Sequence, residues 1–221
     1  IDAGAFSMSG IKSITLPNNI TKISAGCFFS CYELISIDIP DNVTVIERDS
    51  FGGCYNLKSI KMSDNITSIG YMSFDCCSSL TSITIPSNVE IIESGVFSYC
   101  TKLSTVTLPE NVRKIQVGAF NECTNLKEII SMNTTPPNFD YSNIPYSECG
   151  VKVPYEAVGA YQASDDWRSF SNIEAINETG IIKVYNGNNT KIYASDITYA
   201  KSKATTDNAL IFVNDGNTYS E

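Results

Sequence analysis

The sequence predicts an α/β repeat solenoid, a right-handed coil with a parallel β-sheet, closed by a C-terminal cap and followed by a small β-rich appendage. Apolar residues recur every 23 positions, and within each unit a stretch of strand-like alternation is followed by a turn-rich stretch. The 221 residues are 43% apolar and 18% charged, which is the composition of a folded protein. One unit cannot bury its own apolar face, so stacked units must share a core.

Three columns of identical residues carry the period: Phe28, Phe51, Phe74, Phe97 and Phe120; Cys31, Cys54, Cys77, Cys100 and Cys123; and Leu34, Leu57, Leu80, Leu103 and Leu126. An earlier copy starts at Ile1, with Phe6 displaced by one residue and Met8 assigned to the Cys position. Because the chain begins without Met and inside a repeat, we expect it to be a fragment of a longer protein whose export signal lies upstream.

Each unit begins with a predicted strand. In the segment 34–39, Ile37 and Ile39 alternate with polar residues and are expected to point inward. A proline follows this segment in several units, and proline cannot donate to a strand ladder. Val43 to Ile46 predicts a second short extended piece, and 95–100 predicts a helical turn. Six stacked strands would make one parallel sheet roughly 24 Å tall.

The five cysteines of the repeated column are predicted to be free core thiols rather than disulfides, and Cys149 is expected to be buried under the cap. A disulfide needs converging Cβ atoms ~3.8 Å apart, whereas side chains in one column point the same way. The alternative is a zinc site at Cys27 and Cys31 or at Cys76 and Cys77. The sequence contains no His and no C-x-x-C pair, so we expect neither a metal nor a cofactor.

A column of asparagines is predicted to mark a corner of the solenoid: Asn42, Asn65, Asn88 and Asn111. Asn tolerates left-handed turns and bonds to the backbone, so a structural ladder is the favoured interpretation. Asn19, Asn42 and Asn65 also fit the acceptor pattern for N-glycosylation, which is the alternative.

The unit from Leu80 to Cys100, L-x-x-I-x-I-P-x-x-V-x-x-I-x-x-x-x-F-x-x-C, resembles the BspA-like leucine-rich repeat family, and residues 1–130 match it. The resemblance implies a leucine-rich-repeat solenoid. It also implies an extracellular or cell-surface protein of a host-associated bacterium that adheres to host proteins or to other cells.

Residues 131–176 are predicted to cap the last coil. The stretch 134–137 breaks the repeat, Val151 begins a short strand, and 155–163 predicts a helix. Trp167 is interpreted as a core plug, with a sugar-stacking platform as the alternative. Residues 177–221 predict the β-rich appendage, with a linker at 177–180, a hairpin around 186–189 and a further strand at 209–213.

Charge and hydropathy exclude several classes of partner. The net charge of −9 disfavours nucleic acid and anionic membrane surfaces. No apolar run approaches the ~20 residues of a membrane span, so we expect no direct membrane insertion. Host matrix or cell-surface proteins, with glycans as a second class, remain as partners.

The outward strand columns predict binding rather than catalysis. Hydrolysis of a glycosidic bond needs two carboxylates ~5–10 Å apart, and Asp38 has no acidic neighbour in these columns. Asp165 and Asp166 are assigned to a helix end or a solvated loop. A threonine array of the ice-binding kind is interrupted by Asp38 and Lys61.

The sequence therefore predicts a non-enzymatic secreted or cell-surface protein that mediates protein–protein interaction or adhesion. The alternative is a carbohydrate-binding or carbohydrate-active accessory module. The candidate binding residues lie on the outward strand face: Asp38, Lys58, Ser59, Lys61, Ser82 and Thr84.

Overall fold

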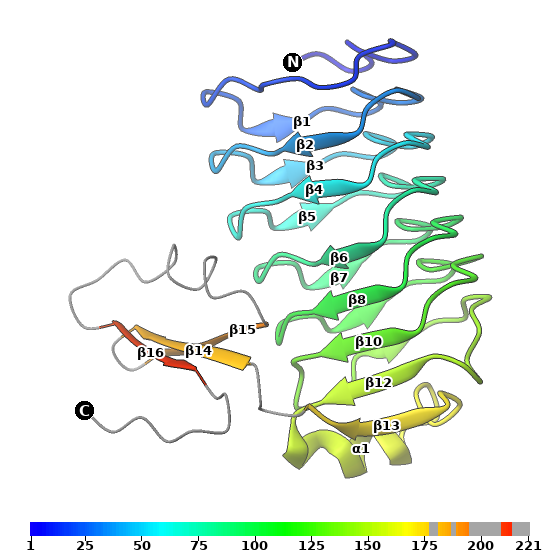
Figure 1. Ribbon diagram of the computed structural model, residues 1–221, viewed down its shortest axis with the longest axis vertical. Coiled ribbons are helices and arrows are strands. Elements are labelled where there is room, and N and C mark those ends of the chain that lie inside the picture. The colour runs from blue at the N-terminus through cyan, green and yellow to red at the C-terminus, as the bar shows by residue number, and fades with distance from the viewer. Residues whose placement is uncertain (177–180, 187–188, 195–208, 214–221) are drawn as a thin grey trace. The chain divides into compact units, whose positions relative to one another are not determined.

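A computed structural model describes residues 1–176, 181–186, 189–194 and 209–213 (Figure 1). The chain divides into two compact units, Ile1–Ala175 and Ile176–Glu221. The first unit is a solenoid of parallel strands, as the repeats predict, and it contains the candidate site.

Two stacks of strands run along the solenoid. The first consists of β2 (Ser36–Asp38), β4 (Ser59–Lys61), β6 (Ser82–Thr84), β8 (Thr105–Leu108), β10 (Glu128–Ser131), β12 (Gly150–Val153) and β13 (Asn172–Ala175). The second consists of β1 (Lys22–Ile23), β3 (Val45–Ile46), β5 (Ser68–Ile69), β7 (Ile91–Ile92), β9 (Lys114–Ile115) and β11 (Asn138–Phe139). All pairings within these stacks are parallel.

The first stack is not the single sheet that the sequence predicts. β2 and β4 form a sheet of two strands, and β6, β8, β10, β12 and β13 form another of five. The second stack is interrupted at the same level, between β5 and β7. The columns of buried residues continue through this level, although Met62 stands where the neighbouring coils have Ile39 and Ile85, and Ser63 stands where they have Pro40 and Pro86. The side-chain period alone does not predict that the strands separate there.

The third side of each coil is a series of tight turns rather than the predicted helical turn. Gly95 and Tyr99 have φ values of 65° and 55°, and these left-handed residues prevent helix formation. Successive backbone amides of the turn alternate between bonding within the turn and bonding to the next coil. Ser98 N–H donates to Gly95 O within the turn at 3.1 Å. Phe97 N–H donates to Ala119 O of the next coil at 2.8 Å.

The first copy also differs from the prediction. Met8 lies in a left-handed turn position with φ 58°, equivalent to that of Ser30, and its side chain is exposed. Ser9 occupies the Cys position instead, with its Oγ 3.4 Å from Cys31 Sγ. Met8 N–H donates to Phe29 O, and Ile35 N–H donates to Lys12 O. The residue missing from this copy therefore lies between Met8 and Lys12, after the turn.

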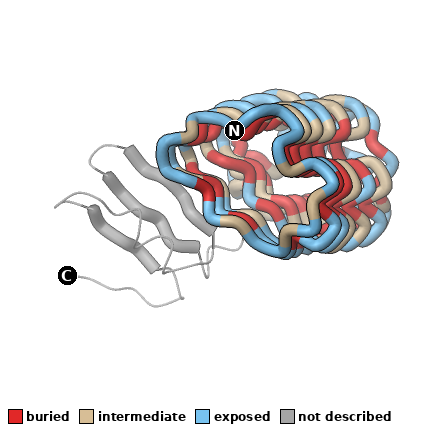
Figure 2. Tube along the Cα trace, turned by 90° about the horizontal axis from the view of Figure 1, so that it is seen from above, coloured by how far each residue is buried: buried red, intermediate tan, exposed pale blue. Residues whose placement is uncertain are grey.

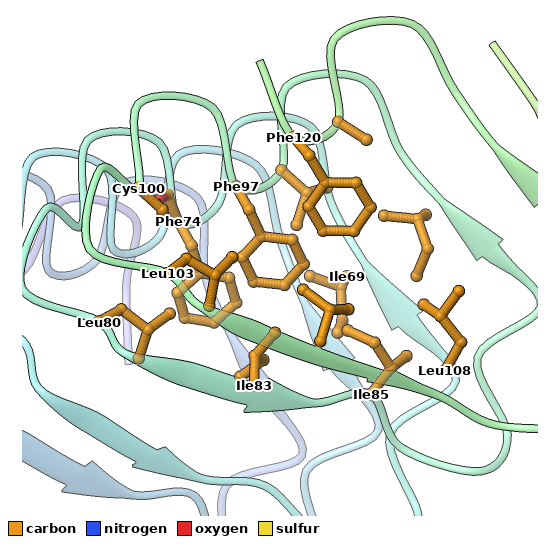
Figure 3. Packing of buried hydrophobic residues seen from close by; sticks show 14 of the residues in the cluster. Ile69, Phe74, Leu80, Ile83, Ile85, Phe97, Cys100, Leu103, Leu108 and Phe120 are labelled. Carbon is orange, nitrogen blue, oxygen red and sulfur yellow. The ribbon is translucent and has the colours of Figure 1, made fainter. Parts of the chain in front are cut away.

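The core runs the length of the solenoid (Figure 2). The five rings from Phe28 to Phe120 are fully buried and stack with centroid separations of 5.2 to 5.6 Å. Figure 3 shows Phe74, Phe97 and Phe120 in this column beside Leu80, Leu103 and the strand isoleucines. Offset stacking adds to the stabilisation from burial, so the phenylalanine column favours one register between coils.

All eight cysteines are free, and those of the repeated column and Cys149 are buried, as predicted. Cys27 is also buried, whereas Cys76 is only partly buried. In the repeated column each thiol donates to a carbonyl of the preceding coil, for example Cys54 to Phe28 O at 3.1 Å and Cys100 to Phe74 O at 3.2 Å. Phe28 O also accepts the Cys31 N–H at 3.1 Å. Cysteine suits this column because it is small, largely apolar and still a donor.

The asparagine ladder is also confirmed. The side-chain amide of Asn65 donates to Asp41 O at 2.9 Å, and that of Asn111 donates to Ser87 O at 2.8 Å. Each bond joins one coil to the preceding coil at the corner between the two stacks of strands. The Asn column therefore has a structural role whether or not its members carry sugars.

The cap begins as a continuation of the solenoid. β11 pairs with β9, and Phe139 stacks on Phe120 although the sequence period has ended. A short helical segment then follows, comprising η1 (Tyr155–Ala157) and α1 (Val158–Ala163). Trp167 is fully buried and donates its Nε1–H to Pro137 O at 2.7 Å, which confirms it as a core plug.

The second unit contains the predicted hairpin and further strand. β14 (Ile181–Asn186) pairs antiparallel with both β15 (Asn189–Ala194) and β16 (Ala209–Val213). The predicted linker at 177–180 lies outside the described residues.

The thiols provide a test of the core. Cys76 is the one cysteine that is not buried, and burial of part of its surface together with the nearby Asp75 raises its pKa to about 11. We expect the native protein at pH 8 to react slowly with a thiol reagent, at Cys76 alone, and all eight thiols to react in denaturant. Because the pKa is raised, the native rate should increase as the pH rises from 7 to 10. Rapid native labelling of several thiols would contradict this packing.

Truncation tests the cap. A chain that ends at Ala175 should remain soluble and keep its melting temperature, because it retains the whole first unit. A chain that ends at Gly150 loses Trp167, Phe170 and both final strands, β12 and β13, and exposes the apolar core of the coil beneath. We expect that chain to aggregate in size-exclusion chromatography. The cap would not be needed if the shorter chain were monomeric and melted at the same temperature.

Candidate functional site

The candidate residues of the strand face are exposed. Asp38, Ser59, Lys61, Ser82 and Thr84 occupy the outward positions of β2, β4 and β6, on either side of inward isoleucines. Alternation along a strand places every second side chain outside, so the pattern of the sequence is sufficient to predict this exposure. Lys58 directly precedes β4 and is also exposed.

The structure brings some of these residues together and separates others. Asp38 pairs in register with Lys61, and Ser59 pairs with Ser36, across β2 and β4. Ser82 and Thr84 pair instead with Thr105 and Thr107 of β8. The predicted site thus consists of a charged part on β2 and β4 and a hydroxyl-rich part on β6 and β8. The interruption in the sheet lies between the two parts.

The charged side chains of the first part do not form ion pairs with one another. Among the ion pairs within 4.0 Å in the described part of the chain, none joins Asp38 to Lys61 or uses Lys58. Further along the same face, by contrast, Lys152 Nζ lies 2.6 Å from Glu128 Oε1, and this hydrogen bond raises the pKa of Lys152. The opposite charges near β4 are therefore not neutralised by each other, whereas those at β10 and β12 are.

The adjacent carboxylates of the cap have structural roles. Asp166 Oδ2 accepts the Phe139 N–H at 3.0 Å, and Asp165 Oδ1 lies 3.0 Å from Arg168 Nη1. Each carboxylate thus has its own partner, which supports the prediction that the two do not form an acid–base dyad. Trp167 is buried, so it offers no ring face to a sugar.

The turn side carries exposed groups that the sequence analysis did not single out. Tyr32 and Tyr55 are about half exposed, and their rings stack at 5.5 Å with an interplanar angle of 11°. The signal was available, because the two residues lie 23 positions apart, directly after the Cys column. Phe29 is also exposed, and its ring lies against Gly52, where a Cβ would be 3.3 Å away.

The turn side also holds a carboxyl with a shifted pKa. Burial raises the pKa of Asp75, partly opposed by hydrogen bonds from Cys76 and Ser98, and the charge of Asp49 raises it further. The pKa of Cys76 is also raised, so this thiol is not an activated nucleophile.

The described residues contain no cluster of three or more His, Cys, Asp or Glu side chains suited to a metal ion. Among them, no helix has the length and apolar character needed to cross a bilayer.

Comparison with known proteins agrees with the fold. A family model described as a BspA type leucine-rich repeat region matches residues 1–127 in six copies. No curated protein matches the chain.

Several solved structures are similar to the chain. A leucine-rich repeat protein of T. pallidum is 24% identical, with a TM-score of 0.54, over 74% of this chain and 69% of that one. The pneumococcal vaccine antigen PcpA is 17% identical, with a TM-score of 0.59, over 76% of this chain and 42% of that one. A leucine-rich cell surface protein of Faecalibacterium prausnitzii is 23% identical, with a TM-score of 0.48, over 79% and 50% of the two chains.

At these identities the two matches with TM-scores above 0.5 establish the fold alone. The family model, in contrast, spans more than half of the chain, and its repeats coincide with the Phe, Cys and Leu columns that form the core. The chain belongs to the BspA-type leucine-rich repeat family.

Proposed function

We propose that this chain is a non-catalytic adhesion module that works outside the cell or at the cell surface, and that its partners are host matrix or cell-surface proteins. Leucine-rich repeats of this type are consistent with a protein-interaction role. The adjacent carboxylates of the cap, Asp165 and Asp166, each have a structural partner there.

The observation that carries the proposal is the exposed pair of opposite charges on β2 and β4. The strand register holds Asp38 and Lys61 side by side, and Lys58, which directly precedes β4, is also exposed. Strands fix the backbone of these residues, so a partner that pairs with them loses little additional conformational freedom of the protein. Complementary charge sets the orientation of a protein partner more than it sets affinity.

The hydroxyl-rich part on β6 and β8 supplies weaker and less directional contacts. Such contacts bind weakly one at a time, and several copies of the protein on one surface would strengthen adhesion through multivalency. A glycan partner would use mainly these hydroxyl groups, so it is an alternative outcome of the same experiment.

Binding to panels of matrix proteins and glycans tests the proposal. We expect a protein partner to be bound, and Lys58→Glu and Lys61→Glu each to weaken binding about tenfold, which corresponds to about 1.4 kcal/mol. Lys102→Glu is the matched control, since it makes the same charge change at an exposed residue on the turn side. All three variants should melt like the parent, because the substituted side chains are exposed.

Two results would count against the proposal. If Lys102→Glu weakens binding while Lys58→Glu and Lys61→Glu do not, the partner binds the turn side instead. If the protein binds glycans alone and both strand-face variants bind them normally, the carbohydrate-binding alternative replaces protein adhesion.

A further inference from the structure

The two stacks of strands are interrupted at one level of the solenoid, which we call the seam. It lies between the coil of residues 57–79 and the coil of residues 80–102. β4 and β6 do not pair there, and neither do β5 and β7, although each of these strands pairs with its other neighbour. Figure 1 shows the wider spacing between β4 and β6 than between β6 and β8.

Equivalent amides show what the seam lacks. Ile39 N–H donates to Lys61 O at 2.8 Å, and Ile85 N–H donates to Thr107 O at 2.9 Å. Met62, the equivalent residue at the seam, makes no such backbone bond in the described structure. The same holds for Thr81, Glu90 and Glu93, whose equivalents Ser104, Arg113 and Gln116 all bond to the preceding coil.

The core is also looser at the seam. Ile37, Ile39, Ile83 and Ile85 are at most 4% exposed. Ile60 and Met62 hold the same inward positions in the coil between them, yet both are only partly buried. Both strand-bearing sides of this coil therefore have fewer stabilising interactions with the next coil than other coils have.

The turn side keeps its backbone hydrogen bonds and its ring stacking across the seam. Phe74 N–H donates to Val96 O at 2.9 Å, and Cys76 N–H donates to Ser98 O at 2.8 Å. The rings of Phe74 and Phe97 stack at 5.5 Å, as in the other coils. These bonds hold one side of the solenoid at its usual spacing.

One further contact crosses the seam at the corner between the two stacks of strands. The side-chain amide of Asn88 donates to Asp64 O at 2.6 Å, and Ser87 N–H donates to Asp64 Oδ1 at 3.4 Å. This corner contact is therefore the main polar link between the strand-bearing sides of the two coils.

We infer that the seam is a hinge, with the turn side as its pivot and the Asn88–Asp64 contact as its latch. Bending there moves residues 1–79 relative to residues 80–175 without breaking the pivot bonds. The strand face would then change its curvature between its charged part and its hydroxyl-rich part. This inference does not depend on the proposed function, because it concerns the unbound protein.

Distances between spin labels test the hinge. In a Cys76→Ser background, Asp38→Cys and Thr107→Cys place labels three coils apart across the seam. Thr84→Cys and Lys152→Cys place labels in the same column, three coils apart, on one side of it. We expect pulsed EPR to give a broader distance distribution for the first pair. Equal widths for the two pairs would overturn the hinge.

Two further measurements test the Asn88–Asp64 contact and the missing backbone bonds separately. Asn88→Ala should broaden the first distribution further, whereas Asn111→Ala, which removes the equivalent bond from an intact coil, should not. In hydrogen exchange, the Met62 amide should exchange at least about a hundredfold faster than the Ile39 and Ile85 amides. If Met62 is as well protected as these two amides, the strands are paired in solution and no hinge exists.

Discussion

Each coil of the solenoid bonds through its backbone to the next coil in a fixed register, and the position of every core column follows from that register. Strand amides and alternate turn amides both point along the long axis of the solenoid, so the bonds surround each coil except at the seam, where the turn-side bonds remain and the strand pairings are absent. Because equivalent atoms lie above one another, one side chain repeated at a 23-residue interval meets its own copy. Phenylalanine rings then stack, thiols reach carbonyls of the preceding coil, and asparagine amides join the corners.

This constraint explains both the predictable and the unpredictable parts of the fold. Columns were visible in the sequence because a repeated environment selects a repeated residue, as at Phe74 and Cys77. The turn conformation was not visible, because its left-handed positions hold residues as different as Gly95, Met72 and Tyr99. The coil after residue 131 was also missed, since Phe139 completes the ring stack from a position outside the period.

The candidate site shows the same division. Exposure of Asp38 and Lys61 was predictable from alternation, and burial of Trp167 from its size and its place in a terminal unit. The separation of Ser82 and Thr84 from the charged residues could not be predicted, because it arises from a backbone interruption between coils whose columns of buried residues continue in register. The stacking of Tyr32 on Tyr55 was not predicted, because only these two members of the column that follows the Cys column are aromatic.

The most direct test of the register compares two insertions in the same coil. A second copy of residues 80–102, inserted before Leu103, adds one complete period and should give a folded, cooperatively melting protein that is at least as stable. A single alanine inserted between Ser98 and Tyr99 displaces the left-handed position and moves Cys100 out of its column, which should cost about 3 kcal/mol or more. Thermal and denaturant unfolding measure both effects. If the 23-residue insertion unfolds the protein while the one-residue insertion leaves its stability unchanged, register does not govern this fold.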